Sequence, residues 1–147
     1  MAAKKQTKLK TNIHSIFATD KKLEEDGAWV EVNGFYGLKI KVRRLRSEAA
    51  IKAYERIIIE MFGEGKLRKP SDLSADQSQE IIKRQLAEAV LIDWQNLRDT
   101  ETGEDIPYSV DVARELMEIG DFREFVFQAA SERDTFREKA DAEAEGN

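Results

Sequence analysis

The sequence predicts an α+β fold, in which an N-terminal β-hairpin or small antiparallel sheet is followed by a bundle of about four helices. Two runs of β-prone residues between Ala28 and Val42 flank an Asn-Gly turn signal, which indicates the hairpin. From Ser47 onward, apolar residues recur every three or four positions, as in amphipathic helices. The chain has 147 residues, of which 41% are hydrophobic, so it is long enough to bury one core.

We expect a single domain over residues 21–138, preceded by a flexible basic arm at 1–20 and followed by an acidic, frayed tail at 139–147. The arm contains a short helical stretch, NIHSIF, and has no apolar signal-peptide core. No segment approaches the roughly 18 apolar residues of a membrane span, so no membrane partner is expected. The absence of Cys excludes disulfides and thiolate metal sites.

The net charge of −5 conceals opposite charges on the two halves of the chain. Residues 1–70 hold 16 Lys and Arg against 9 Asp and Glu, whereas residues 71–147 hold 8 against 20. The halves should attract each other, either within one fold or between copies that self-associate. A solvated tail is favoured over a nucleic-acid-binding arm, because the chain is acidic overall and no aromatic residues alternate with the lysines.

The hairpin register is predicted from the face that would be apolar. A loop of Val32, Asn33 and Gly34 pairs Val30 with Tyr36 and gathers the apolar side chains on one face. The opposite side then carries a basic stripe, which consists of Lys39, Lys41, Arg43, Arg44 and Arg46. This stripe either meets an acidic partner or keeps an edge strand from pairing with other strands, and the second interpretation is favoured.

Capping residues predict where the helices begin. Ser47 should cap the first helix, which ends at Gly63, and Ser74 with Gln77 forms a capping box for the longest, over 75–97. Ser109 should cap a third helix, and Asp121 with Glu124 should open a fourth. The expected apolar stripe of the first helix is Ile51, Tyr54, Ile58 and Met61.

The apolar stripes of the second and fourth helices have two uses, core packing and partner binding. Core packing is the favoured use of an amphipathic helix face. We hypothesise that the two stripes divide between the core and a partner groove, and the candidate groove residues are Ile82, Leu86, Val90, Phe125 and Phe136.

The acidic stretch DTETGED, between the second and third helices, is read as a solvated turn. An EF-hand loop needs a Glu six residues after its glycine, but Ser109 stands six residues after Gly103. The only histidine, His14, lies in the arm, and the nuclease-like triplet at 64–66 follows a helix instead of lying in a strand. We therefore expect no enzymatic activity, catalytic residue, metal site or cofactor, and weak cation binding by the turn is a disfavoured alternative.

Four segments, in order, carry a resemblance to a known family: IFATDKKLEEDGAWVEV, LKIKVRRLRS, AVLIDWQNLRDTETGEDIPYSVDVARELM and FREFVFQAASERDTFRE. Over residues 13–138 they resemble the tail assembly chaperones of long-tailed bacteriophages. In that family an apolar helix runs into Asp-Trp, a short Asp/Gly turn and an Ile/Leu-Pro-aromatic-Ser cap. The matching residues here are Asp93, Trp94, Asp99, Gly103, Ile106, Pro107, Tyr108 and Ser109. The inserted Thr100-Glu101-Thr102 departs from the family's simpler turn.

The resemblance implies a non-enzymatic protein that binds and solubilises the tape measure protein, helps recruit tail tube subunits, and works in the host bacterial cytoplasm without entering the mature virion. It also implies a longer, frameshifted product. Two alternatives stay open. One is a tail completion or connector subunit that remains in the virion. The other is a nucleic-acid-binding regulator that uses the basic residues of 4–10 and 39–46.

Overall fold

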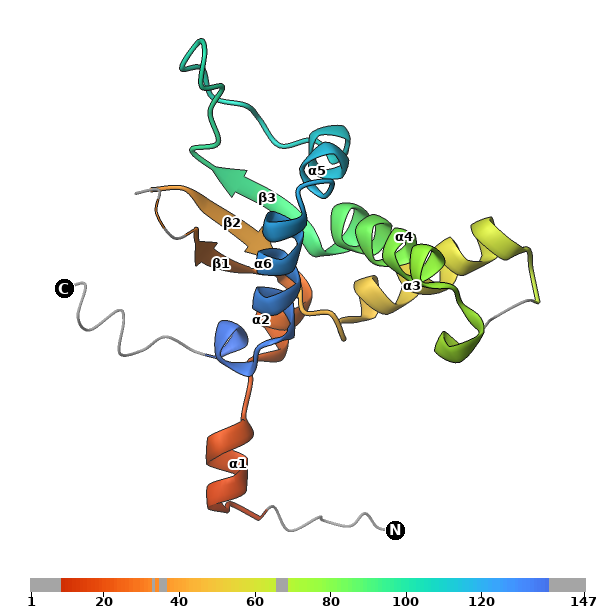
Figure 1. Ribbon diagram of the computed structural model, residues 1–147. Helices are drawn as coiled ribbons and strands as arrows, with labels where there is room; N and C mark the ends of the chain where they lie inside the picture. Colours follow the sequence, from red (N-terminus) through yellow and green to blue (C-terminus); the bar gives the residue numbers. More distant parts are fainter. Residues whose placement is uncertain (1–8, 33, 35–36, 66–68, 138–147) are drawn as a thin grey trace, which may run out of the picture.

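The computed structural model describes residues 9–32, 34, 37–65 and 69–137. In this part of the chain, a three-stranded antiparallel sheet with surrounding helices confirms the predicted α+β class (Figure 1). The N-terminal elements are α1 (Asn12–Phe17), α2 (Lys21–Asp26), β1 (Ala28–Glu31), β2 (Lys39–Val42) and α3 (Glu48–Phe62). The remaining elements are η1 (Pro70–Asp72), α4 (Ala75–Gln85), η2 (Leu86–Val90), β3 (Leu91–Gln95), α5 (Val110–Leu116), α6 (Gly120–Ser131) and η3 (Arg133–Phe136).

The hairpin forms, but its predicted register is wrong by four residues. Val30 lies opposite Ile40, and Tyr36, its predicted partner, falls outside the described residues. Because the shift is an even number, the apolar side chains remain on the predicted face. The Asn96 side chain, just beyond β3, donates a hydrogen bond to the Gly37 carbonyl (2.7 Å), so the third strand helps to hold the longer connection.

The prediction of one helix over 75–97 is also wrong in part, because the C-terminal third of this range forms a strand. Helix α4 ends at Gln85, the π-helical turn η2 follows, and β3 pairs with β2. Trp94 lies opposite Ile40 within this pairing. An apolar run such as 86–92 has no periodicity that separates a helix from a strand, and the unpaired edge of β2 decides the outcome. β2 is therefore the central strand, and its basic residues do not protect a sheet edge as expected.

The predicted helix caps agree with the structure better than the predicted buried faces do. Ser47, Ser74 and Ser109 each accept a hydrogen bond from a backbone N–H in the first turn of a helix, as predicted. Of the stripe expected on α3, Ile58 is buried and Tyr54 and Met61 pack against the cluster around it, but Ile51 is 47% exposed. The residues that α3 buries are Ala50, Ala53, Ile57 and Ile58. The small alanines leave room for α4, whose Gln85 side chain donates to the Ala50 carbonyl (2.8 Å).

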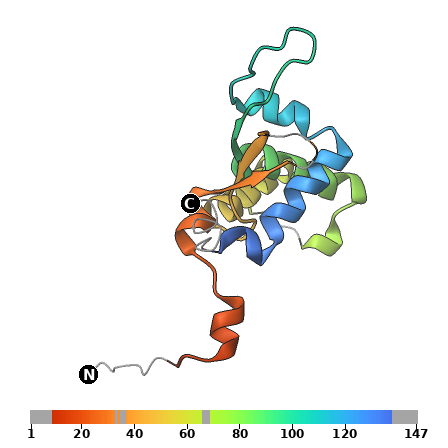
Figure 2. The ribbon, with the colours of Figure 1, turned by 90° about the vertical axis from the view of Figure 1, so that its left-hand side faces the viewer.

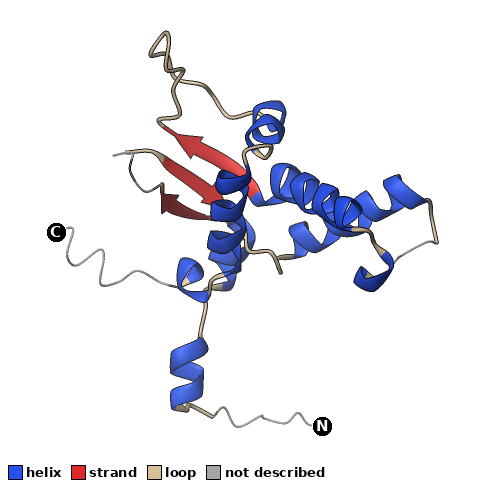
Figure 3. Cartoon of the chain, in the orientation of Figure 1, coloured by secondary structure: helices blue, strands red, loops and turns tan. Residues whose placement is uncertain are grey.

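The fourth predicted helix exists with different ends. Ile119 occupies the N-cap position of α6 without a capping side chain, so Asp121 lies in the first turn and is not the cap. The helix ends at Ser131, and Phe136 reaches the core from the separate turn η3. α6 contacts β2, while α3 and α4 pair to one side of the sheet (Figure 3). None of the helices in the described ranges is long and apolar enough to cross a membrane.

Gly27, between α2 and β1, is required by both conformation and space. Its φ is 103°, and a Cβ atom would lie 2.8 Å from Cδ1 of Ile92 and 3.1 Å from Cγ of Lys41. We expect Gly27→Ala to lower the free energy of unfolding by about 2 kcal/mol, measured by urea denaturation. Gly120→Ala is the matched control, because its Cβ would meet only the end of the Arg123 side chain at 3.8 Å. Equal losses in both variants would contradict this explanation.

Candidate partner-binding surfaces

The residues that resemble the chaperone motif fasten the β3–α5 connection to the sheet. The Trp94 indole N–H donates to the Ile106 carbonyl (2.7 Å), and the Tyr108 hydroxyl donates to the Leu91 carbonyl (2.9 Å). The centres of the Trp94 and Tyr108 rings are 4.8 Å apart. Asp93 precedes Trp94 in β3, whereas Pro107 is exposed between the two anchored residues. The motif thus brings both ends of the connection together.

The turn inside this connection is held by its own hydrogen bonds. The Asp99 carboxylate accepts bonds from the backbone N–H groups of Thr102 and Glu101, which lower the pKa of Asp99 below its ordinary value. Gly103, with φ of 77°, donates its N–H to the Asp99 carbonyl. Within the described ranges, no three His, Asp or Glu side chains are grouped to hold a metal ion. The geometry accounts for these residues as a solvated turn.

The five candidate groove residues separate by burial. Leu86, Val90 and Phe136 are completely buried in the main core, so they are inaccessible to a partner in this structure. Ile82 and Phe125 are only partly buried and border that core. These two residues alone among the five keep surface that a partner could contact.

The predicted basic stripe is divided by the structure. Arg43 donates to the backbone carbonyls of Glu25 (2.7 Å) and Ala89 (3.1 Å), and Arg44 is buried. These two residues follow the end of β2, where the chain leaves the sheet, so the alternation that placed them on one face no longer applies. The remaining three members are Lys39 and Lys41, both half-buried, and exposed Arg46.

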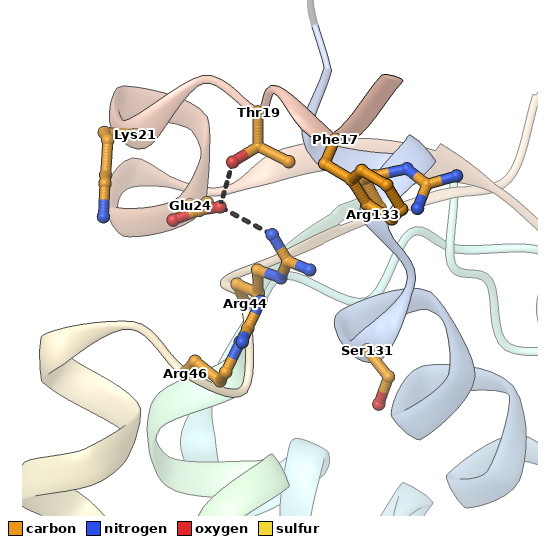
Figure 4. A pocket seen from close by; sticks show the side chains of 8 residues that line it. All are labelled: Phe17, Thr19, Lys21, Glu24, Arg44, Arg46, Ser131 and Arg133. Atoms are coloured by element: carbon orange, nitrogen blue, oxygen red, sulfur yellow. Dashed lines mark hydrogen bonds and ion pairs between the residues drawn. The ribbon is translucent and has the colours of Figure 1, made fainter. Parts of the chain in front are cut away.

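A cationic hollow opens where α2, η3 and the segment after β2 meet (Figure 4). Its volume is about 670 Å³, and its lining residues are Phe17, Thr19, Lys21, Glu24, Arg44, Arg46, Ser131 and Arg133. The Arg133 guanidinium lies over the Phe17 ring, 4.8 Å from its centre. Four basic residues and one acidic residue line the hollow, so it favours an anionic group.

Glu24 and Arg44 form the buried ion pair of this hollow. Their side chains are 12% and 9% exposed, and Nη1 of Arg44 lies 2.7 Å from Oε2 of Glu24. The Thr19 hydroxyl donates to the same oxygen (2.6 Å). Burial alone would raise the pKa of Glu24, but the hydrogen bonds from Thr19 and Arg44, together with the charge of Arg44, lower it below 4.5.

The lowered pKa of Glu24 predicts a loss of stability in acid. Folding favours the ionised carboxylate, so its contribution is fully present above the ordinary pKa of 4.5 and is lost as pH falls through the lower, folded-state pKa. We expect the urea midpoint of the wild type to fall between about pH 6 and pH 3, and the fall to be smaller in Glu24→Gln, which has no charge to lose. Identical pH profiles for the two proteins would contradict this assignment.

A second cluster of charged residues, which the sequence did not reveal, joins α3, η2 and α5. Glu88 has a side chain that is 8% exposed and forms ion pairs with Arg56, Arg84 and Arg114. Burial would raise the pKa of Glu88, but hydrogen bonds from Arg84 and Arg56 lower it. Arg56 and Arg84 also pair with Glu60. Because its carboxylate is saturated by arginines, Glu88 holds helices together and is not free for an external ligand.

Helix α1 is the most exposed apolar surface in the described chain, and it stands away from the body (Figure 2). Its exposed apolar side chains are Ile13 (64% exposed), Ile16 (49%) and Phe17 (58%), and Leu9 (68%) is exposed in the segment before the helix. The helical stretch itself was predicted, but its apolar face was overlooked as a binding surface. The signal was present in the spacing of LKTNIHSIF.

Comparison with known proteins identifies one family. A family model described as YdaY prophage protein matches residues 38–147, which include β2, β3 and the described elements from α3 to η3. No match was found among the curated proteins or the solved structures. The matched segment covers well over half of the chain and most of its core. The chain therefore belongs to the YdaY prophage protein family and is of phage origin.

Proposed function

We propose that this protein is a non-enzymatic tail assembly chaperone, which binds and solubilises the tape measure protein and helps recruit tail tube subunits in the host bacterial cytoplasm. The observation that carries the proposal is the ordered series of chaperone-like motifs over residues 13–138, in a chain of phage origin. The motif residues around Trp94 and Tyr108 fasten a connection to the sheet, so their part in the proposal is to shape the domain.

The surface chemistry supports this proposal. A long helical protein with apolar stripes aggregates unless those stripes are covered. The chain offers partly buried Ile82 and Phe125, while its net charge of −5 adds repulsion between coated complexes. A partner helix could bury its apolar stripe against these residues.

The proposal is tested by co-expressing this protein with the long helical protein encoded by the same prophage. We expect the partner to be soluble and to co-purify only when this protein is present. Ile82→Glu and Phe125→Glu should abolish this rescue while circular dichroism still shows a folded protein, because both side chains retain exposed surface. Ile51→Glu, on the exposed face of α3, is the matched control and should rescue as well as the wild type.

Other outcomes would select a different function. A partner that stays insoluble, together with detection of this chain in purified virions, would favour a tail completion or connector subunit. The cationic hollow favours a second candidate, a nucleic-acid-binding regulator, because Lys21, Arg46 and Arg133 lie around one opening. In that case DNA or RNA should be retained at low salt and released steeply as salt increases.

A further inference from the structure

Helix α1 is attached to the rest of the protein at its C-terminal end. Arg137 donates hydrogen bonds to the carbonyls of Ser15 (3.1 Å) and Ile16 (3.3 Å), and the Asp20 N–H donates to the Phe136 carbonyl (2.8 Å). With the Arg133–Phe17 contact, these bonds fix only the C-terminal end of α1 on η3. The rest of the helix projects away from its own core (Figures 1 and 2).

This projecting helix needs a partner to be stable. It has six residues and none is buried, whereas an isolated helix shorter than about 12 residues is marginal in water. Its capping box, formed by Thr11 and His14, defines where it starts but covers none of its apolar face. Burial of that face against another surface would supply the missing stabilisation.

A groove with complementary chemistry lies between β1 and η3. It has a volume of about 540 Å³, and its lining residues are Trp29, Val30, Glu31, Lys39, Glu132, Asp134 and Thr135. Trp29 and Val30, which belong to the edge strand β1, provide apolar surface, and the three acidic residues outnumber the single lysine. We call this the acidic groove.

The segment that leads into α1 and the acidic groove carry opposite charges. Residues 1–17 contain four lysines and no acidic residue, and Lys10 directly precedes Thr11, the N-cap of α1. A basic, amphipathic segment is thus complemented by an apolar groove with an acidic rim.

We propose that α1 of one copy of this chain docks in the acidic groove of a second copy. The contact is head-to-tail, because each copy contributes its helix on one side and its groove on the other. A contact of this kind leaves one helix and one groove free, so further copies can be added. The inference concerns copies of this chain alone and does not depend on the proposed function.

The test is to measure the mass of the purified full-length protein by sedimentation over a range of concentrations, without any other protein. We expect the mass to rise beyond that of a dimer, and to fall with added salt because charges contribute to docking. Ile13→Asp/Ile16→Asp should weaken association by about a hundredfold or more, since two apolar side chains lose their burial. Glu31→Lys/Glu132→Lys should weaken the association, because the new lysines in the groove would repel the lysines that precede α1. Ile51→Asp, on α3, should associate like the wild type.

Mixing the two double variants gives the sharpest result. Each variant alone should be monomeric. The Ile13→Asp/Ile16→Asp variant keeps an intact groove, and the Glu31→Lys/Glu132→Lys variant keeps an intact α1. An equimolar mixture should therefore form a dimer and no larger assembly. Circular dichroism should show that both are folded, because every substituted residue is exposed. A wild type that stays monomeric, including one whose α1 folds into its own groove, overturns the inference. So does a mixture that stays monomeric.

Discussion

Phe136→Ala is expected to lower the free energy of unfolding by about 3–5 kcal/mol, the largest effect of any single substitution considered for this protein. The Phe136 ring is completely buried, joins the core cluster beneath the sheet, and lies 5.7 Å from the Arg44 guanidinium. Its removal would leave a cavity at the point where η3 meets the sheet and α2. Urea denaturation followed by circular dichroism would measure the loss.

The matched control for this experiment is Phe17→Ala. Phe17 is 58% exposed and touches the body through Arg133, so the same chemical change should cost less than about 1 kcal/mol. If Phe136→Ala left stability unchanged but prevented partner binding, the side chain would belong to a groove and the buried position would be incorrect. The pair of variants therefore separates a core role from a binding role.

Glu24→Ala is expected to have the second-largest effect, a loss of about 3 kcal/mol in the free energy of unfolding. The substitution leaves the Arg44 guanidinium without its carboxylate at a site where the arginine side chain is only 9% exposed. The Thr19 hydroxyl also loses its acceptor. The cost comes mainly from an uncompensated buried charge, because an intact buried pair contributes little net stability by itself.

A double-mutant cycle tests that explanation. In Glu24→Ala/Arg44→Met the uncompensated charge is gone, so the double variant should be more stable than Glu24→Ala alone. Lys22 and Asp26 provide a control, because they form an i,i+4 pair whose side chains are 83% and 58% exposed. Asp26→Ala should leave the stability almost unchanged, because solvent screens an exposed pair. Additive effects of the Glu24 and Arg44 substitutions would rule out coupling between the two residues.

Local signals in the sequence were sufficient for most helix starts. Ser47, Ser74 and Ser109 cap helices as predicted, because a cap depends on contacts between residues two or three apart. The hairpin was predicted from the alternation of apolar and polar residues. Its predicted register was wrong by an even number of residues, so the predicted faces were still correct. These features need no information about distant parts of the chain.

The third strand could not be predicted in the same way. Residues 86–92 are apolar at nearly every position, so neither a helical nor a strand period is visible, and the preceding helix favoured continuation. The free edge of β2 makes 91–95 a strand, and that edge exists only after the hairpin has formed. Formation of this strand then places Trp94 opposite Ile40 and determines where the β3–α5 connection starts.

The candidate surfaces were predicted only in part. Apolar spacing identified the five candidate groove residues but could not show that Leu86, Val90 and Phe136 would be enclosed, since burial depends on which elements pack above them. The cationic hollow combines residues from three separated segments, as do the ion pairs around Glu88. Such clusters have no spacing in the sequence, so only the folded chain reveals them.

The sequence by itself determined the α+β class, the hairpin faces, the main helix caps and the opposite charges of the two halves, because each depends on composition or on neighbours within a few residues. Tertiary structure decided the register, the conversion of 91–95 into a strand, and which apolar faces are covered. It also decided that α1 projects from the body while the acidic groove stays open beside η3. These outcomes depend on contacts between distant segments, whose energies appear only when the segments meet.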